Sequence, residues 1–424
     1  MAQFPGTDAD ETFNGDPDHR NFAHMGGGKD RVYGGDLIDT IFGDAGVDLL
    51  YGGGGDDLLA GGGGDDGLAG GSGIDVLDGG TGDDTLDLAA GGQAFGGTGD
   101  DQIILRYVAG LTSEITAGSG DDLILIFAGA HGRFDGGAGQ DLIGYADSIA
   151  EPGVGVVVDL LTGRGGGAAA GDIYVSIEDV YGSSFDDVLI GRSVVNTLGG
   201  GAGNDTITGG GGGDYLDVED GIDVLDYGNS QTAVQVDLST GAARGGDAQE
   251  DVFLNFESIS GSAFADTLTG DAGSNVLRGN GGADRLFGGD DNDTLVGGNG
   301  NDRLAGGLGS DTLYGGLGAN VFVFASTLDT PSAQIRDRIL DFSSAERDRI
   351  DLSGIDANTA AATDQAFTFI GADRFHGNPG ELRVVVNGNV SVVTGDINGD
   401  KIADFQVNVT GDPAHPLTAT DFIL

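Results

Sequence analysis

The sequence predicts an all-β fold: a solenoid of short parallel strands in several blocks, with β-rich inserts and a C-terminal β cap. A nine-residue pattern, Gly-Gly-x-Gly-x-Asp-x-U-x with U apolar, occurs 22 times when its Gly and Asp positions alone set the frame. Four copies follow one another without a gap over residues 52–87. The eighth position did not set the frame, yet it is apolar in all 22 copies of a chain that is only 38% hydrophobic. This regularity predicts a folded repeat protein, although 86 Gly residues would otherwise suggest disorder.

One repeat suffices for one turn and one short strand. Positions 7 to 9 form the strand, and its middle residue faces inward because neighbouring side chains in a strand point to opposite sides. Gly at positions 1, 2 and 4 is expected to supply backbone angles that a Cβ atom would forbid. Two repeats then close one full coil, with one strand on each side. Coils stacked about 4.8 Å apart give two parallel sheets around a thin apolar core, which is a parallel β-roll.

The pattern divides the chain into five segments. A longer internal repeat relates Val156–Gly163 to Val234–Gly241 and Gly182–Asp187 to Gly261–Asp266. Each copy begins with a β-rich insert and continues with a new block of nine-residue repeats. After residue 324 the pattern is lost, and short runs of alternating apolar and polar residues predict a β cap over the open end of the roll. The expected segments are a lead-in or N-terminal cap, 1–24; a β-roll that degenerates after 88, 25–144; an insert with a β-roll block, 145–226; a second insert with a β-roll block, 227–324; and the C-terminal cap, 325–424.

Stacking aligns the sixth position of every second repeat in columns along the two edges of the roll. Carboxylates one coil apart repel by roughly 0.8 kcal/mol per pair in bulk water, and by more when they are partly desolvated. A hard dication held by carboxylates and turn carbonyl groups reverses this repulsion, and Ca²⁺ accepts about six to eight oxygen ligands where Mg²⁺ requires an octahedron. An isolated Gly-Asp turn would indicate only a stable turn that binds no metal. Here, however, the sixth position is Asp in 19 copies and Asn in the other three. The expected calcium ligands in the turns are Asp30, Asp39, Asp48, Asp57, Asp66, Asp75, Asp84, Asp101, Asp122, Asp141, Asp187, Asp205, Asp214, Asp223, Asp266, Asp284, Asp293, Asp302 and Asp311.

A second calcium candidate lies in the C-terminal segment and consists of Asp396, Asn398, Asp400 and Asp404. Oxygen-bearing residues at positions 1, 3, 5 and 9 match an EF-hand-type loop. The sixth position, however, is Lys401 where Gly is expected, and the twelfth is not Glu. A plain turn rich in Asp and Asn therefore stays the alternative.

Composition restricts the partners and the compartment. The formal net charge of −51 excludes nucleic acid as a partner and disfavours an anionic membrane surface. The chain has no Cys, so disulfides do not contribute to its stability. The N-terminal segment 1–17 lacks the basic and apolar regions of a cleaved signal peptide. No apolar run approaches the roughly 20 residues of a membrane helix, so no transmembrane segment is expected.

The repeats of residues 25–324 resemble those of the RTX (hemolysin-type calcium-binding repeat) family of type I-secreted proteins. The C-terminal region resembles the C-terminal domain of serralysin-type metalloproteases, through Gly315–Phe324, Asp337–Phe342 and Asp348–Ser353. Asp421–Leu424, an acidic residue followed by apolar ones, looks like the export element of that family. The resemblance implies a parallel β-roll with several bound calcium ions, a type I exporter that reads the C-terminus, and a secreted, extracellular protein without a cleaved N-terminal signal that folds on reaching calcium.

The sequence departs from the enzymes of that family. Serralysin-like proteases place a catalytic domain ahead of the roll, whereas here only the segment 1–24 precedes the first full repeat. Neither a His-Glu-x-x-His zinc motif nor a Gly-x-Ser-x-Gly elbow is present. We therefore expect a non-catalytic protein with a matrix, surface-layer or adhesive role. The alternatives are a polysaccharide-binding or targeting module, and a cryptic hydrolase that uses the insert acids Asp159 and Glu178 or Asp237 and Glu257, although two similar copies are more typical of residues that close the fold.

Overall fold

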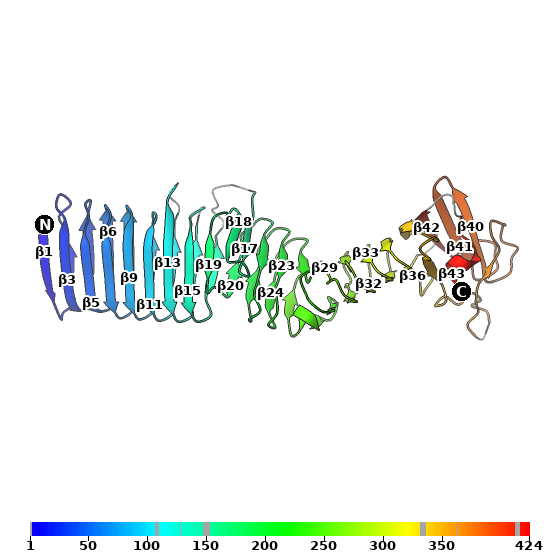
Figure 1. The fold of residues 1–424 in the computed structure, drawn as a ribbon, viewed down its shortest axis with the longest axis horizontal. Coiled ribbons are helices and arrows are strands. Elements are labelled where there is room, and N and C mark those ends of the chain that lie inside the picture. Colours follow the sequence, from blue (N-terminus) through cyan, green and yellow to red (C-terminus); the bar gives the residue numbers. More distant parts are fainter. Residues whose placement is uncertain are drawn as a thin grey trace. The chain divides into compact units, whose positions relative to one another are not determined.

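The protein was analysed as a computed structural model, which describes residues 2–106, 110–127, 129–146, 153–330, 336–361, 363–411 and 416–424. These residues form β-strands and two short 3₁₀ turns, which confirms the expected all-β class (Figure 1). Among them, no helix has the length and apolar character needed to cross a membrane. The chain divides into two compact units, residues 1–209 with 214–221 and residues 210–213 with 222–424.

The first unit is a roll of two parallel sheets. Sheet I contains β1 (Ala2–Thr7), β3 (Asn21–Gly28), β5 (Thr40–Gly46), β7 (Leu58–Gly63), β9 (Asp75–Thr81), β11 (Gly92–Thr98), β13 (Thr112–Ser119), β15 (His131–Ala138), β19 (Ile173–Val175) and, beyond the hairpin of β17 (Val156–Asp159) and β18 (Arg164–Gly167), β21 (Val188–Ile190) and β23 (Thr206–Thr208). Sheet II contains β2 (Thr12–Asn14), β4 (Arg31–Gly35), β6 (Leu49–Gly54), β8 (Gly67–Ser72), β10 (Thr85–Leu88), β12 (Gln102–Leu105), β14 (Leu123–Ile126), β16 (Leu142–Tyr145), β20 (Asp179–Tyr181), β22 (Thr197–Gly199) and β24 (Tyr215–Asp217).

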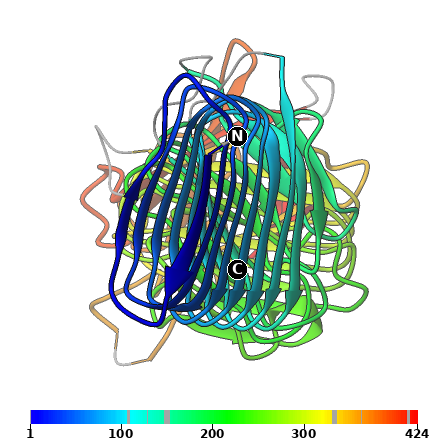
Figure 2. The ribbon, with the colours of Figure 1, turned by 90° about the vertical axis from the view of Figure 1, so that its left-hand side faces the viewer.

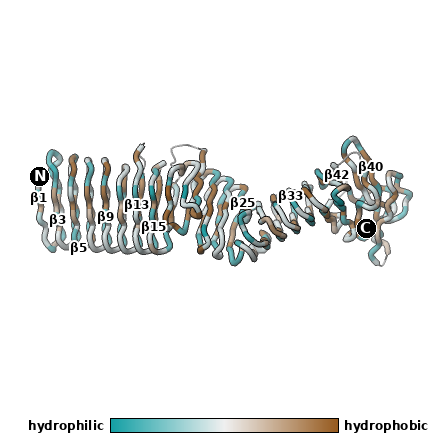
Figure 3. The backbone as a smooth tube through the Cα atoms, viewed as in Figure 1, coloured by the Kyte–Doolittle hydropathy of each residue, from teal (hydrophilic) through white to brown (hydrophobic). Residues whose placement is uncertain are grey.

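The register of these sheets confirms that two repeats make one coil. Leu50 pairs with Val32 on one side and with Leu68 on the other, and all three side chains are at most 2% exposed. From coil to coil the strands of the first unit stack side by side (Figures 1 and 2), and apolar residues recur at the same height (Figure 3). In the degenerate part the ladder continues with coils of unequal length, from Leu86 through Ile103 and Ile124 to Ile143. The differences in length are therefore accommodated in the turns, while the inward position of the strand is kept.

The lead-in is itself a coil of the roll, because β1 pairs with β3 and β2 pairs with β4, both in parallel. The first insert forms the antiparallel hairpin β17–β18, and β17 then pairs in parallel with β21. Residues 147–152 of this insert lie outside the described part of the chain. The segment boundaries expected from the sequence stay predictions.

The second unit continues the same design in sheets III and IV. Sheet III contains β25 (Val224–Asp226), β29 (Ser258–Ser260), β31 (Val276–Arg278), β33 (Thr294–Asn299), β35 (Thr312–Leu317) and β37 (Arg338–Phe342), followed by β42 (Phe405–Gly411), β41 (Val390–Asp396), β40 (Glu381–Asn387) and β39 (Thr368–Phe369). Sheet IV contains β27 (Ala242–Arg244), β26 (Gln235–Asp237), β30 (Thr267–Thr269), β32 (Arg285–Gly289), β34 (Arg303–Gly307), β36 (Val321–Val323), β38 (Arg349–Asp351) and β43 (Phe422–Ile423). The remaining elements are β28 (Val252–Leu254) and the 3₁₀ turns η1 (Gly246–Ala248) and η2 (Ala419–Asp421).

The C-terminal region closes the end of the second unit as a β cap. Its strands β40, β41 and β42 pair in an antiparallel meander, and β42 also pairs in parallel with β37 of the roll. The segment Asp421–Leu424 contains β43, which pairs with β38 and buries Phe422 to 3% exposure. Paired strands therefore cover edges that an open solenoid would leave exposed.

The glycines of the turn have two different physical roles. Positions 2 and 4 adopt positive φ angles, for example 107° at Gly62 and 118° at Gly64, which a side chain rarely tolerates. The first-position Gly61 has no positive φ angle, so the expectation that all three glycines serve backbone angles was wrong for position 1. A Cβ atom on Gly61 would instead collide with a side-chain oxygen of Asp66 and approach the carbonyl oxygen of Gly79. Position 1 is thus glycine because oxygens crowd its Cα atom.

Candidate metal centres in the turns

The structure places every predicted aspartate of the turns at the end of its turn, one residue before or at the start of a strand. All 19 are buried, with at most 3% of each residue exposed. In sheet II of the first unit the column is continuous from Asp30 to Asp141, whereas the column before sheet I contains Asp39, Asp57 and Asp75, is interrupted at β11 and β13, and is present again at Asp187 and Asp205. Residues 92 and 112 begin the next strands of sheet I without an aspartate. This part of the roll therefore keeps carboxylates on one edge only.

One oxygen of each column carboxylate is used within the protein. The backbone N–H of Asp48 donates to Oδ1 of Asp66 at 2.8 Å, and the N–H of Asp66 donates to Oδ1 of Asp84 at 2.7 Å. The same bond joins Asp293 to Asp311 at 2.9 Å in the second unit. Each bond links one coil to the next, so the column supports the stacking even before any cation is considered.

The second oxygen, Oδ2, has a different environment. Among the described residues it is buried without a hydrogen-bond donor in Asp30, Asp39, Asp48, Asp57, Asp66, Asp75, Asp84, Asp101, Asp122, Asp141, Asp284, Asp293, Asp302 and Asp311. A Cβ atom built on the first-position glycine would meet both Oδ2 and the carbonyl oxygen of the equivalent glycine one coil further, at 2.3 and 2.8 Å for Gly61. A carboxylate oxygen and a carbonyl oxygen thus lie near the same glycine, and Oδ2 has no donor. A cation, or a proton taken up by the carboxylate, would stabilise such a pair.

Burial has the expected effect on the acidity of the columns. Desolvation, reinforced by neighbouring carboxylates, raises the pKa of Asp57, Asp284 and Asp293 to about 7. It raises the pKa of Asp66 and Asp122 to about 6, against the lowering effect of the N–H bond that each accepts. Without a cation, ionising these groups therefore costs free energy.

The arrangement fits Ca²⁺ better than a transition metal. Within the described residues, no three acidic or histidine side chains converge on one point. A bound ion must therefore combine carboxylates from successive coils with carbonyl oxygens of the glycine turns. An all-oxygen set of irregular geometry is typical of calcium, because Zn²⁺ prefers nitrogen and sulfur ligands and Mg²⁺ prefers an octahedron with water.

Two predicted ligands, Asp187 and Asp266, have a different environment. In each turn a serine replaces the second-position glycine, and its backbone N–H donates to Oδ2 of the aspartate at 2.5 Å. The serine hydroxyl also donates to Oδ1, at 2.9 Å from Ser183 and 2.8 Å from Ser262. These two turns begin the repeat blocks after the inserts. In both, the serine is a donor to Oδ2, the oxygen that lacks a donor in most other turns and favours a cation there.

The three asparagines of the columns also provide their own donors. The side-chain amide of Asn196 donates to the carbonyl oxygen of Glu178, and that of Asn275 donates to Glu257 at 3.0 Å. Asn320 donates to the carbonyl oxygen of Gly316 at 3.3 Å. An amide group thus supplies a hydrogen where an aspartate would leave an oxygen, so a cation is not required at these places.

The insert acids serve the fold. Glu178 accepts the backbone N–H of Asp141 at 3.2 Å, and Glu257 accepts that of Asp223 at 2.9 Å, so each glutamate takes the place of the next column aspartate. Asp159 and Asp237 accept backbone N–H groups within their own hairpin turns. All four acids are thus engaged at corresponding places of the two inserts.

Sequence reasoning missed two members of the columns. Asp337 accepts the N–H of Asp311 at 2.8 Å, and Asp348 accepts that of Asn320 at 2.8 Å, after steps of 26 and 28 residues. Burial raises the pKa of Asp337 to about 8, and its Oδ2 has no donor among the described residues. The sequence signal that could have identified both aspartates is the tripeptide Asp-Arg-Ile, which the two segments share. Its isoleucines, Ile339 and Ile350, are fully buried two residues after the aspartate.

A second, exposed ladder was also not expected. The fifth-position Asp83 donates its N–H to Asp65 at 3.1 Å, and Asp100 and Asp121 continue the series at 2.9 and 2.8 Å. Here the bond runs from the later coil to the earlier one, opposite to the buried ladder. The edge of sheet II therefore carries two parallel rows of carboxylates.

The loop 396–404 forms a network of its own. Asp396 is fully buried and accepts the N–H groups of Gly399 at 2.6 Å and Lys401 at 2.9 Å. The amide group of Asn398 donates to Asp404 at 3.0 Å, and Asp400 accepts the N–H of Ile402 at 2.8 Å. These bonds are those of a turn rich in Asp and Asn. Calcium ligation by this loop stays a prediction.

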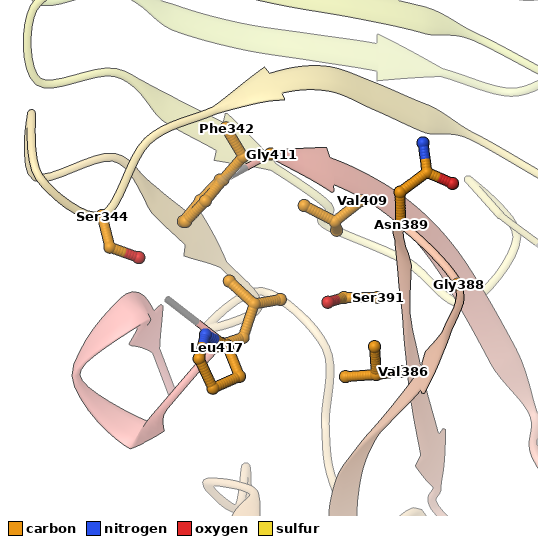
Figure 4. A pocket seen from close by; sticks show the side chains of 10 residues that line it. Phe342, Ser344, Val386, Gly388, Asn389, Ser391, Val409, Gly411 and Leu417 are labelled. Carbon is orange, nitrogen blue, oxygen red and sulfur yellow. The ribbon is translucent and has the colours of Figure 1, made fainter. Parts of the chain in front are cut away.

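The cap contains a small pocket between β40, β41, β42 and the segment before η2 (Figure 4). Phe342, Val386, Val409 and Leu417 line it together with Ser344, Asn389 and Ser391. No acidic or basic side chain is among its lining residues. Its lining is thus a mixture of apolar and neutral polar side chains.

Comparison with known families agrees with this geometry. The RTX calcium-binding nonapeptide repeat matches residues 33–68, 61–92, 195–225 and 260–295, and the peptidase M10 serralysin C-terminal domain matches residues 283–424. No curated protein sequence matches the chain.

Solved structures with detectable similarity include two repeat modules. The R3 subunit of a mannuronan C5-epimerase from Azotobacter vinelandii is 30% identical, with 38% of this chain and 78% of that chain covered and a TM-score of 0.22. The R2 subunit is 30% identical over 39% of this chain and 90% of that chain, with a TM-score of 0.24. An extracellular lipase from Serratia marcescens is 17% identical over 58% of this chain and 39% of that chain, with a TM-score of 0.19.

Replacing column aspartates by asparagine tests which residues share an ion. Asp293→Asn and Asp311→Asn keep the acceptor of the ladder but place an amide group at the free oxygen. The two changes should be non-additive, with a coupling of roughly 0.5–3 kcal/mol, because both remove ligands from one ion. The measurement is the calcium midpoint of folding of the full chain. Asp293→Asn with Asp302→Asn, on the other edge, is the matched control and should be close to additive; equal coupling in both pairs would mean that adjacent repeats share an ion.

Acid should partly replace calcium in stabilising the roll. The folded-state pKa values of about 6 to 7 lie above the value of about 3.9 in an unfolded chain, so the folded state binds more protons between these limits. Without calcium, the fold is therefore most stable at the acidic end and loses stability as pH rises through 6 to 7. Circular dichroism of the metal-free chain should show more β-structure at pH 5 than at pH 8. With calcium present, acidification should weaken folding; more order at pH 8 than at pH 5 without metal would contradict the assignment.

Proposed function

Because the chain belongs to the RTX calcium-binding repeat proteins and contains a serralysin-type C-terminal domain, we propose that it is a non-catalytic extracellular protein that folds on calcium. Its cofactor is Ca²⁺, bound at several sites along the repeats, and its families are those of type I-secreted proteins. The role that fits this architecture is structural: a component of a matrix or surface layer, or an adhesive protein.

The observation that carries the proposal is the buried Oδ2 atom that has no hydrogen-bond donor and lies at a first-position glycine beside a turn carbonyl oxygen, in turn after turn. In a cell interior poor in calcium, these oxygens and the charge of −51 oppose the stacking of coils. In a calcium-rich medium each bound ion stabilises the folded state by an amount that grows with the ratio of ion concentration to dissociation constant. Metal binding and folding are then one equilibrium.

The residues that we propose as ligands are the column aspartates whose Oδ2 has no donor, from Asp30 to Asp141 in the first unit and from Asp284 to Asp311 in the second. Asp337 joins them because it has the same environment. Asp205, Asp214 and Asp223 are proposed on their position in the same columns. Ligation by Asp187 and Asp266 has weaker support, since serine already satisfies both of their oxygens.

A hydrolase is the main rival to a non-catalytic role. The insert acids that could act in hydrolysis accept backbone N–H groups at corresponding places of two inserts, which supports a role in the fold. Screening the calcium-folded chain on polysaccharides, esters and peptides separates the two hypotheses. Turnover that disappears in Glu178→Gln or Glu257→Gln, while the fold is kept, would establish the enzyme instead.

The proposed export partner is a type I exporter that reads the C-terminal segment. In the folded protein Asp421 accepts the N–H of Thr418 at 2.7 Å, and the following residues form β43. An exporter can read this segment before the cap has formed, because the chain folds only after it has met calcium. The proposed location is extracellular.

Calcium should convert a largely disordered chain into the β-roll. We expect far-ultraviolet circular dichroism to show little regular structure in chelator and a β spectrum after addition of calcium, with a midpoint at roughly 10⁻⁴–10⁻³ M, the range of extracellular calcium modules. Magnesium at the same concentration is the control and should have a much smaller effect. A spectrum that does not change over the titration would exclude calcium-driven folding.

Export should depend on Asp421–Leu424. Deleting this segment should leave the protein inside a host that has a matching type I exporter, as measured by the amount in the medium. Arg349→Gln is the control, because it removes the 2.7 Å bond to the carbonyl oxygen of Phe422 and loosens β43 but keeps the segment. If the deleted chain reaches the medium as efficiently as the intact one, the segment is only the last strand of the cap.

A further inference from the structure

Sheet IV presents a row of arginines on its outer face. Leu286 and Leu304 face the core at 0% exposure, so the residues on either side of them face outward. Arg285 lies beside Arg303 in the parallel register of β32 and β34. The same row continues through the next strands to Arg349, and in the other direction through Thr267 and Gln235 to Arg244 at the edge strand β27. All four arginines are exposed.

This row is unusual in a chain with a net charge of −51. The other outward row of sheet IV contains two acids, and both are engaged: Asp237 accepts the hydroxyl of Ser239 at 2.6 Å, and Asp351 binds Arg303 at 2.9 Å. Within the described part of the chain, no carboxylate pairs with Arg244 or Arg285. Two guanidinium groups thus stay available on a face where most charges are positive.

The rest of the face is suited to a polar, elongated ligand. A shallow groove lies over β26, β27 and β30, lined by Gln235, Asp237, Arg244, Thr267 and Thr269 among others. It leads in register to Arg285, which neighbours Thr267. On the same face Phe287 is 37% exposed. Hydrogen-bonding groups, free guanidinium groups and an accessible aromatic ring therefore follow one another across the strands.

We propose that this face of sheet IV binds a linear acidic polysaccharide of the uronate class. Neighbouring strands are about 4.8 Å apart, which is comparable to one sugar residue of an extended chain, so carboxylates several sugars apart can meet arginines on separate strands. The planar guanidinium group binds carboxylates with two parallel hydrogen bonds, which fits Arg244 and Arg285 to this ligand. The threonine hydroxyls can bind sugar hydroxyls, and Phe287 offers a surface for the apolar side of a sugar ring.

The narrowness of the row favours a single thin chain over a membrane or a nucleic acid duplex. The turns that follow β30 and β32 contain Asp271, Asp290 and Asp291, and the last two are exposed. A wide anionic surface would meet these carboxylates as well as the arginines, whereas one polysaccharide chain contacts only the row. More distant acids are screened, because the Debye length is about 8 Å at physiological salt.

The inference rests on the proposed function in one respect, since the face exists only when calcium has stacked the coils. The test uses the full chain in saturating calcium, with hyaluronan as an acidic polysaccharide that has a uronate at every second sugar and dextran as a neutral polymer of similar length. The variant is Arg244→Gln with Arg285→Gln. The matched control is Arg278→Gln, which removes an exposed arginine from sheet III of the same unit. Circular dichroism establishes that each variant is folded.

The intact chain should bind hyaluronan and not dextran, with an affinity that falls as salt is added. The double variant should bind hyaluronan roughly tenfold more weakly, and Arg278→Gln should bind as the intact chain does. A folded chain that ignores hyaluronan would overturn this inference and leave calcium-driven folding intact, whereas a chain that does not fold in calcium would overturn both. Equal losses in the double variant and in Arg278→Gln would also overturn it, as would binding to vesicles of anionic phospholipid in place of hyaluronan through the same two arginines.

Discussion

The buried carboxylate oxygens of the turn columns, which have no hydrogen-bond donor, are the constraint on which the rest of this structure depends. The core of each coil is thin, since a strand contributes only one or two buried apolar residues, such as Leu59 in β7 or Ile103 and Leu105 in β12. The ladder bond from N–H to Oδ1 aligns successive coils, but at Asp66 and its equivalents it also brings Oδ2 into a place where no donor among the described residues reaches it. The coils are thus stacked in register, but the buried carboxylates lack a compensating positive charge. A dication bound as proposed would supply the missing positive charge, and metal binding would then be coupled to folding.

The glycines follow from the same constraint. A larger residue at Gly61 would collide with Oδ2 of Asp66 and approach the carbonyl oxygen of Gly79, so the first glycine keeps room for both oxygens, while the second and fourth shape the turn. In some turns the residues around the column are different and supply hydrogen-bond donors. Ser183 and Ser262 provide donors after the inserts, and Asn275 and Asn320 carry their own. Serine and asparagine therefore mark the places where coils can stack without metal.

The sequence predicts most of the roll because every level of the repeat agrees: an apolar eighth position, turn glycines and an acid in a fixed place. It could not predict which column residues already have donors, since Asp187 and Asp66 occupy the same place in the pattern and only the neighbouring Ser183 distinguishes the first. It missed Asp337 and Asp348 because steps of 26 and 28 residues break the period that identified the others. The sequence alone also did not reveal the arginine row, since its members are far apart in the sequence and become neighbours only when the strands are in register.

Charge is separated in space as a consequence of this architecture. Acids gather in the turns because the turns hold the ions, and the rows of Asp66 and Asp83 on one edge show how densely they can be placed. The outward positions of the strands lie away from the turns and their proposed ion sites. Their side chains can therefore be neutral or basic, and in sheet IV they include Arg244, Arg285 and Arg349. Calcium bound at the edges, as proposed, would lower the repulsion that the whole molecule exerts on an anionic ligand, so the arginines of sheet IV would attract such a ligand within a few ångströms of their surface.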